Sequence, residues 1–157
     1  MTALSVRENV DLLKPPLLGW VKELISLPTK YDKPLRIVVQ SKQQLLSSRC
    51  ENARQQGESI EQCIKRINVL AFYRPSTSTI HFPDYVDMSG AYGIGTLMHE
   101  LTHYVQDITG RWRCTAGIES EAYRNELLLA DVYPMTYQNR AYLNKYIKQF
   151  DEKDCTD

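Results

Sequence analysis

The sequence predicts an α+β fold in which a small β-sheet packs on helices. Three observations support this prediction. Short β-prone runs gather in the middle of the chain, amphipathic helical patterns occupy both ends, and no repeat, low-complexity tract or linker divides the 157 residues. A chain of this length can bury a hydrophobic core of its own. We therefore expect one domain spanning residues 1–157.

The N-terminal part predicts two helices separated by prolines. Residues 4–13 form the first, which Pro15 and Pro16 should end because proline lacks the N–H that a helix interior needs. Residues 17–27 form the second, which Pro28 ends. Its apolar residues recur at helical spacing: Leu17, Leu18, Val21, Leu24 and Ile25.

The middle of the chain predicts the sheet. Residues 35–39 are short, β-branched and preceded by a proline, which favours a strand. Residues 43–55 are predicted to be helical up to Gly57. Residues 67–73 and 78–82 are two β-prone runs around four residues that include a proline, the signature of a hairpin.

The C-terminal half predicts three helices. Apolar residues recur at helical spacing over 96–107, where Gly110 is well placed to follow the last turn. The same pattern covers 118–132 and 136–150.

Composition and charge exclude several classes of protein. Lys+Arg and Asp+Glu both number 19, so the net charge is zero. A nucleic-acid-binding domain would show a clustered basic excess, and no apolar run is long enough to span a membrane. We expect a peptide or protein as the partner, no nucleic acid and no membrane, and leave the oligomeric state open.

The cysteines bear on the compartment. None of the four stands in a CxxC pattern, so a structural zinc knuckle is not expected. They are Cys50, Cys63, Cys114 and Cys155. Charged residues near the N-terminus leave no apolar stretch for an export signal, which favours free thiols in the cytoplasm. Pairing of the cysteines would instead indicate export, and Cys50 with Cys63 would close a short polar loop.

The sequence His99-Glu-Leu-Thr-His103 is an HExxH motif inside a helical pattern. Residues four apart lie on one face of a helix, so His99 and His103 can bind one zinc ion together. Glu100 can act as the general base that takes a proton from the attacking water. The motif also contains two of the only three histidines. We therefore expect one zinc ion per chain.

A catalytic zinc needs a third protein ligand and one open position. The chain lacks the longer HExxHxxGxxH motif, because Gln106 stands where its glycine would be. The remaining His81 lies upstream in a predicted strand. Carboxylates of the next helix are better candidates, and three are available: Glu119, Glu121 and Glu126.

The HELTH motif followed by a helix containing Glu-Ala resembles the gluzincin branch of the HExxH metallopeptidases, including the compact ImmA/IrrE-like proteins. The resemblance covers about residues 67–132. It implies a minimal zincin-like fold and a third ligand from the next helix, just before a small residue. That position is Glu121, with Glu119 as its main rival. Gluzincins often place an Asp four residues later to orient a ligand histidine, and Asn125 stands there.

Several supporting roles stay open. Gln106 is interpreted as an ordinary polar helix residue, with a hydrogen bond near the site as the alternative. The strand 78–82 is a candidate edge strand for holding an extended substrate. The oxyanion donor has four candidates: His81, Tyr123, Tyr133 and Tyr137.

These features predict a zinc-dependent peptidase. The alternative is a dedicated regulatory or partner-binding protein on the same fold with little general proteolysis. A third reading is a structural zinc, which would need Cys114 or His81 as a fourth ligand.

Overall fold

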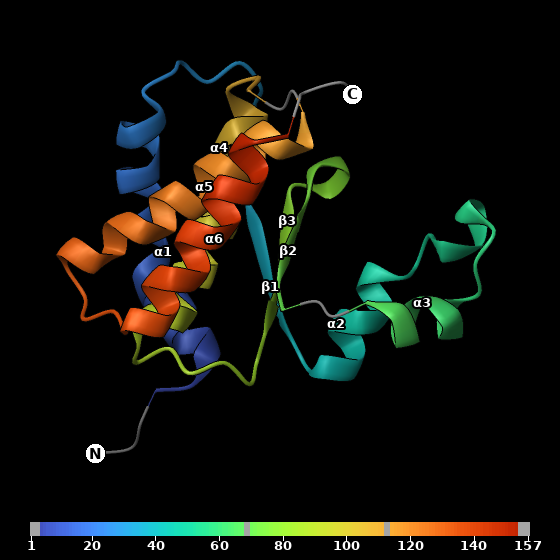
Figure 1. The fold of residues 1–157 in the computed structure, drawn as a ribbon. Helices are drawn as coiled ribbons and strands as arrows, with labels where there is room; N and C mark the ends of the chain where they lie inside the picture. Colours follow the sequence, from blue (N-terminus) through green and yellow to red (C-terminus); the bar gives the residue numbers. More distant parts are fainter. Residues whose placement is uncertain (1–3, 68–69, 112–113, 154–157) are drawn as a thin grey trace.

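The computed structural model describes residues 4–67, 70–111 and 114–153, and these form an α+β domain, as predicted (Figure 1). The helices and strands follow in the order α1 (Val6–Ile25), β1 (Arg36–Gln40), α2 (Lys42–Arg49), α3 (Ile60–Arg66), β2 (Phe72–Arg74), β3 (Thr79–Pro83), α4 (Ala91–Ile108), α5 (Thr115–Leu128) and α6 (Tyr137–Asp151). Helices α1, α4, α5 and α6 gather on one side of the strands, and α2 and α3 stand on the other. Helix α4 contacts both α1 and α5.

Helix α1 is continuous where the sequence predicted a break. Pro15 and Pro16 lie inside it, and both are exposed. The carbonyl groups that lose their helical partner therefore face the solvent side of the helix, where water can satisfy them. The opposite face buries Val10, Leu17 and Val21 in the core. Burial of this apolar stripe outweighs the two missing hydrogen bonds.

The three strands form one mixed sheet in the order β1-β3-β2. Strand β1 runs parallel to β3, and β2 runs antiparallel to β3. The predicted hairpin is confirmed. Among the described residues its first strand covers Phe72–Arg74, and residues 68–69 of the predicted run lie outside them. Strand β3 is the central strand, so the expectation that residues 78–82 form a substrate-binding edge is wrong. Strands β1 and β2 lie on either side of β3, at the two edges of the described sheet.

The predicted helix 43–55 is divided in two. Helix α2 ends at Arg49, and a separate 3-10 turn covers Ala53–Gln56 up to Gly57. Helix α3 then begins at a capping box, in which the Ser59 hydroxyl accepts from the Gln62 N–H and the Gln62 side chain accepts from the Ser59 N–H.

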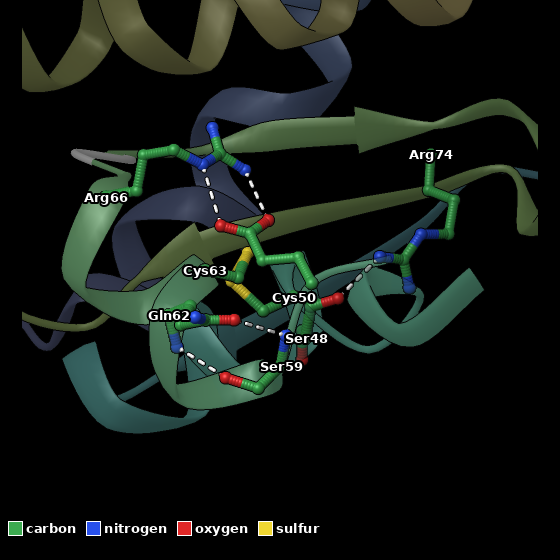
Figure 2. The surroundings of a disulfide bond; sticks show 8 residues. Ser48, Cys50, Ser59, Gln62, Cys63, Arg66 and Arg74 are labelled. Atoms are coloured by element: carbon green, nitrogen blue, oxygen red, sulfur yellow. Dashed lines mark hydrogen bonds and ion pairs between the residues drawn. A yellow bond between two sulfur atoms is a disulfide. The ribbon is translucent and has the colours of Figure 1, made fainter. Parts of the chain in front are cut away.

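A disulfide joins Cys50, directly after α2, to Cys63 in α3 (Figure 2). Both cysteines are buried with Ala53 in a small apolar cluster separate from the main core. Because this cluster is so small, the covalent link between the two helices is an important part of what holds them together.

Helix α4 begins five residues earlier than predicted, at Ala91, and nearly all of it is buried. Gly110 follows it with a φ of 75°, which confirms its predicted place after the last turn. Helices α5 and α6 were predicted correctly apart from shifts of their ends. In the parts of the chain that the structure describes, no helix is both long and apolar enough to cross a membrane. With the disulfide, this leaves the compartment open.

Candidate metal centre

Helix α4 places His99 and His103 side by side, as their four-residue spacing predicted. Their ring centroids lie 4.7 Å apart. Both histidines are buried, at 8% and 5% exposure. Two buried imidazoles on the same helix face require polar partners, because unpaired polar groups are costly in a protein interior.

Glu119 of helix α5 supplies the partner that the two imidazoles share. One carboxylate oxygen lies 3.1 Å from His99 Nε2, and the other lies 3.2 Å from His103 Nε2. The three residues each offer a ligand atom, and these atoms all lie within 4.8 Å of one another. Two histidines and one carboxylate are a ligand set typical of catalytic zinc.

The assignment of Glu121 as the third ligand does not agree with this geometry. Its carboxylate accepts a hydrogen bond of 3.0 Å from Gln106 Nε2 and pairs with Arg111. Two residues along a helix correspond to a rotation of about 200°, so Glu119 and Glu121 cannot face the same group. In this structure Glu119, the rival that the sequence left open, faces the two histidines, and Glu121 does not.

The other ring nitrogens of both histidines are also engaged. His99 Nδ1 lies 2.7 Å from a carboxylate oxygen of Glu126, and His103 Nδ1 lies 2.9 Å from Gln106 Oε1. The Gln106 Nε2 donates to the Ile118 carbonyl, so its Oε1 must accept from the His103 Nδ1–H. Both Nδ1 atoms therefore carry hydrogen, and both Nε2 atoms face Glu119.

Gln106 is thus an orienting residue, contrary to the interpretation of an ordinary solvated side chain. It is fully buried, at 0% exposure. Its amide joins His103 to helix α5 through the Ile118 carbonyl and Glu121. Such partners fix the tautomer and the ring orientation of a ligand histidine.

The sequence interpretation gave Glu126 no orienting role, although its spacing from Glu119 indicates that the two side chains share a helix face. It lies seven residues after Glu119, so both carboxylates project from the same face of α5. Gly95 of helix α4 leaves room for the Glu126 side chain, since a Cβ at Gly95 would lie only 3.2 Å from a Glu126 carboxylate oxygen. Asn125 donates to the Thr102 hydroxyl at 3.2 Å and does not orient a histidine.

The electrostatics of the cluster favour a cation between its members. Burial raises the pKa of Glu119, but hydrogen bonds from His103 and His99 outweigh burial and hold that pKa well below its usual range. Without the protons of these hydrogen bonds, the two Nε2 lone pairs would repel the Glu119 carboxylate across these short distances, so protons or a bound cation must lie between them. A cation bound among the three atoms removes that repulsion, and the donor set fits zinc.

Glu100 differs from the other acids of the site in having an unsatisfied oxygen. It is buried at 6% exposure, and its Oε2 has no hydrogen-bond partner among the described residues. Burial raises its pKa, and the nearby His99 and His103 act in the opposite direction. A buried carboxylate with an unsatisfied oxygen is suited to accept a proton from a water or substrate group that enters the site.

The cluster opens into a cavity of about 540 Å³. Its walls include His99, Glu100, His103 and Glu119 together with Tyr123, whose ring centroid lies 4.5 Å from that of His99. Among the described lining residues, Tyr123 is the one candidate oxyanion donor of the four proposed from the sequence.

Neither proposed fourth ligand completes a closed zinc site. Cys114 is disulfide-bonded and therefore offers no thiolate. His81 Nδ1 lies 2.9 Å from Gln40 Oε1, and its ring stacks on Phe72. Both residues lie outside the His99, His103 and Glu119 cluster.

The fold and the cluster together define an α+β domain with a buried His-Glu-x-x-His helix and a potential His-His-Glu ligand set. A family described as a domain of unknown function (DUF6647) matches residues 7–131, and the chain belongs to this family. The matched range contains all residues of the cluster and ends before α6. No curated protein and no solved structure matches the chain.

Proposed function

We propose that this protein is a zinc-dependent peptidase, with His99, His103 and Glu119 as the zinc ligands and Glu100 as the general base. The observation that carries the proposal is the convergence of three ligand atoms whose orientation is already fixed. Glu126 and Gln106 hold the Nδ1 atoms, so both Nε2 atoms face Glu119 and can bind a metal together with it.

Zinc in such a site lowers the pKa of a bound water to about 7 and polarises a substrate carbonyl. The protein supplies the remaining elements of peptide hydrolysis. Glu100 offers an unpaired carboxylate oxygen to accept the water's proton and can pass it to the leaving amine. Tyr123 offers a hydroxyl on the cavity wall beside His99 as a donor to developing negative charge.

Strand β2 provides a place for an extended peptide. Residues 71–74 all line the cavity, and within the described part of the sheet β2 pairs with β3 alone. The other edge of β2 can therefore form main-chain hydrogen bonds with a peptide strand. This role replaces the one that the sequence had suggested for β3.

The decisive experiment combines metal content with a substitution of the general base. The purified protein should contain about one zinc ion per chain and cleave members of a mixed peptide library. Glu100→Gln should retain the zinc and lose roughly 10²–10⁴-fold in cleavage rate, the usual contribution of a positioned base. A protein without zinc, or full activity in the Glu100→Gln variant, would contradict the proposal.

A further inference from the structure

Arg49 lies at the end of helix α2, directly before the disulfide-bonded Cys50. Helix α2 stands across the sheet from the helices that carry the metal cluster (Figure 1). Arg49 nevertheless lines the same cavity as His99 and Glu119. The proposed catalytic site and an exposed guanidinium group from a different part of the fold therefore face one shared space.

The guanidinium group of Arg49 is held against an aromatic ring. It lies 5.5 Å from the ring centroid of Phe72, the first residue of strand β2. A second guanidinium group, that of Arg74, lies 5.3 Å from the same ring. Contact with the ring face limits the freedom of an arginine side chain and keeps its planar donor fork available.

These two arginines differ in their other partners. Arg74 pairs with Glu51 and donates to the Ser48 carbonyl, and Figure 2 shows its side chain extending toward Ser48 beside the disulfide. Arg49 forms no ion pair within the described residues. Both guanidinium groups therefore contact the Phe72 ring, but only Arg74 has a carboxylate as an ion-pair partner. The positive charge of Arg49 at the cavity wall is left uncompensated.

The acids of the cavity do not neutralise this charge. Glu119 and Glu126 are bound to the two histidines, and Glu100 is buried beside them. A substrate group that carries a carboxylate would be repelled near these acids and attracted at Arg49, which can bind both carboxylate oxygens through its fork.

We propose that Arg49 is a specificity residue that binds a carboxylate of the peptide substrate, so that the enzyme prefers peptides carrying an acidic group at a fixed distance from the cleaved bond. This inference rests on the proposed peptidase function. The carboxylate can belong to an acidic side chain or to the peptide C-terminus, and the two sources can be separated by experiment.

The test uses one set of peptides in four matched forms. Each peptide cleaved by the zinc-loaded protein is resynthesised with Glu or Gln at each acidic position, and with a free or an amidated C-terminus. The wild-type protein should cleave the preferred form at least about tenfold more efficiently, the size expected for a charge-assisted hydrogen bond. Dependence on Glu against Gln identifies a side chain, and dependence on acid against amide identifies the C-terminus.

Arg49→Gln should abolish this preference, so that the charged and the neutral forms of a peptide are cleaved with equal efficiency, and the effect should appear mainly in KM. Arg49→Lys should keep part of the preference, since it retains the charge without the fork. The matched control is Arg54→Gln, which removes an exposed charge from the neighbouring 3-10 turn outside the cavity lining and should retain the preference. A misfolded variant would lose all substrates together.

Binding provides a readout that does not depend on cleavage. The Glu100→Gln protein should bind the carboxylate form more tightly than its neutral partner in a fluorescence anisotropy titration, and the double variant with Arg49→Gln should bind both forms equally. Equal cleavage or binding of charged and neutral forms by the wild-type site would overturn the role of Arg49 and leave the peptidase function intact. Failure to cleave any peptide would instead contradict the peptidase function. The binding comparison would then use the four forms of one acidic library peptide, and it would still decide on Arg49.

Discussion

Replacing Glu119 by Gln tests the ligand set most directly, because Glu119 and Glu121 lie on the same helix and only Glu119 faces the histidines. The substitution keeps the size of the side chain but removes the charge that both Nε2 atoms face at 3.1 and 3.2 Å. Zinc bound by four protein ligands has an apparent binding free energy of about 10–16 kcal/mol, so one ligand contributes roughly 2.5–4 kcal/mol. We therefore expect Glu119→Gln to weaken zinc binding by roughly 10²–10³-fold.

The measurement is competition for zinc against a fluorescent chelator of known affinity at fixed pH. Glu121→Gln is the matched control, since it makes the same chemical change two residues away. Its amide oxygen can still accept from Gln106, so zinc affinity should stay close to that of the wild type. Unchanged affinity in Glu119→Gln, or a larger loss in Glu121→Gln than in Glu119→Gln, would refute the ligand assignment.

Two further predictions concern stability. Replacing both Cys50 and Cys63 by Ser should lower the free energy of unfolding by about 3 kcal/mol, the chain-entropy value for so short a loop, while zinc binding is retained. Denaturant unfolding measures the first effect and zinc titration the second. Loss of zinc binding would contradict this prediction. Burial, reinforced by Arg74, lowers the pKa of His81 below its unfolded value, so stability is present above about pH 6.5 and is lost as the pH falls through that value toward the lower folded pKa. His81→Gln should therefore show a flatter decline in unfolding free energy from pH 7 to 5 than the wild type in the presence of a metal chelator, and parallel curves for the two proteins would show that His81 contributes nothing.

Local patterns predicted most of the elements correctly but not all of their limits. The helical spacing over 96–107 and 136–150 identified α4 and α6, because an apolar stripe must face a core wherever that core lies. Pro15 and Pro16 misled the prediction, since their effect depends on whether the carbonyl groups they leave unpaired face water. That depends on which side of α1 packs against α4.

The order of the strands also lay beyond local patterns. The runs at 72–74 and 79–83 are both β-prone, and nothing within either one tells which lies at the edge. Strand β1 comes from far earlier in the chain and pairs with β3, which makes β3 central. This long-range pairing places β2 at an edge of the sheet, where it lines the cavity.

The residues of the candidate site also fall into two groups, those that a local pattern predicts and those that only helix packing brings together. The HExxH spacing alone brought His99 and His103 together, because four residues of helix fix the geometry of that pair. The third group of the cluster is a carboxylate from another helix. Which of Glu119, Glu121 and Glu126 faces the histidines depends on how α5 is rotated against α4. The buried role of Gln106 depends on that same contact.

The sequence by itself determined the α+β class, the helix that carries the two histidines and the acid next to the first of them, since these follow from periodicities within a single segment. The tertiary structure decided that Glu119 faces the imidazoles, that Glu126 and Gln106 orient them, and that Arg49 reaches the same cavity from across the sheet. These contacts join segments that are distant in the chain, and the packing of whole helices and strands sets which side chains meet.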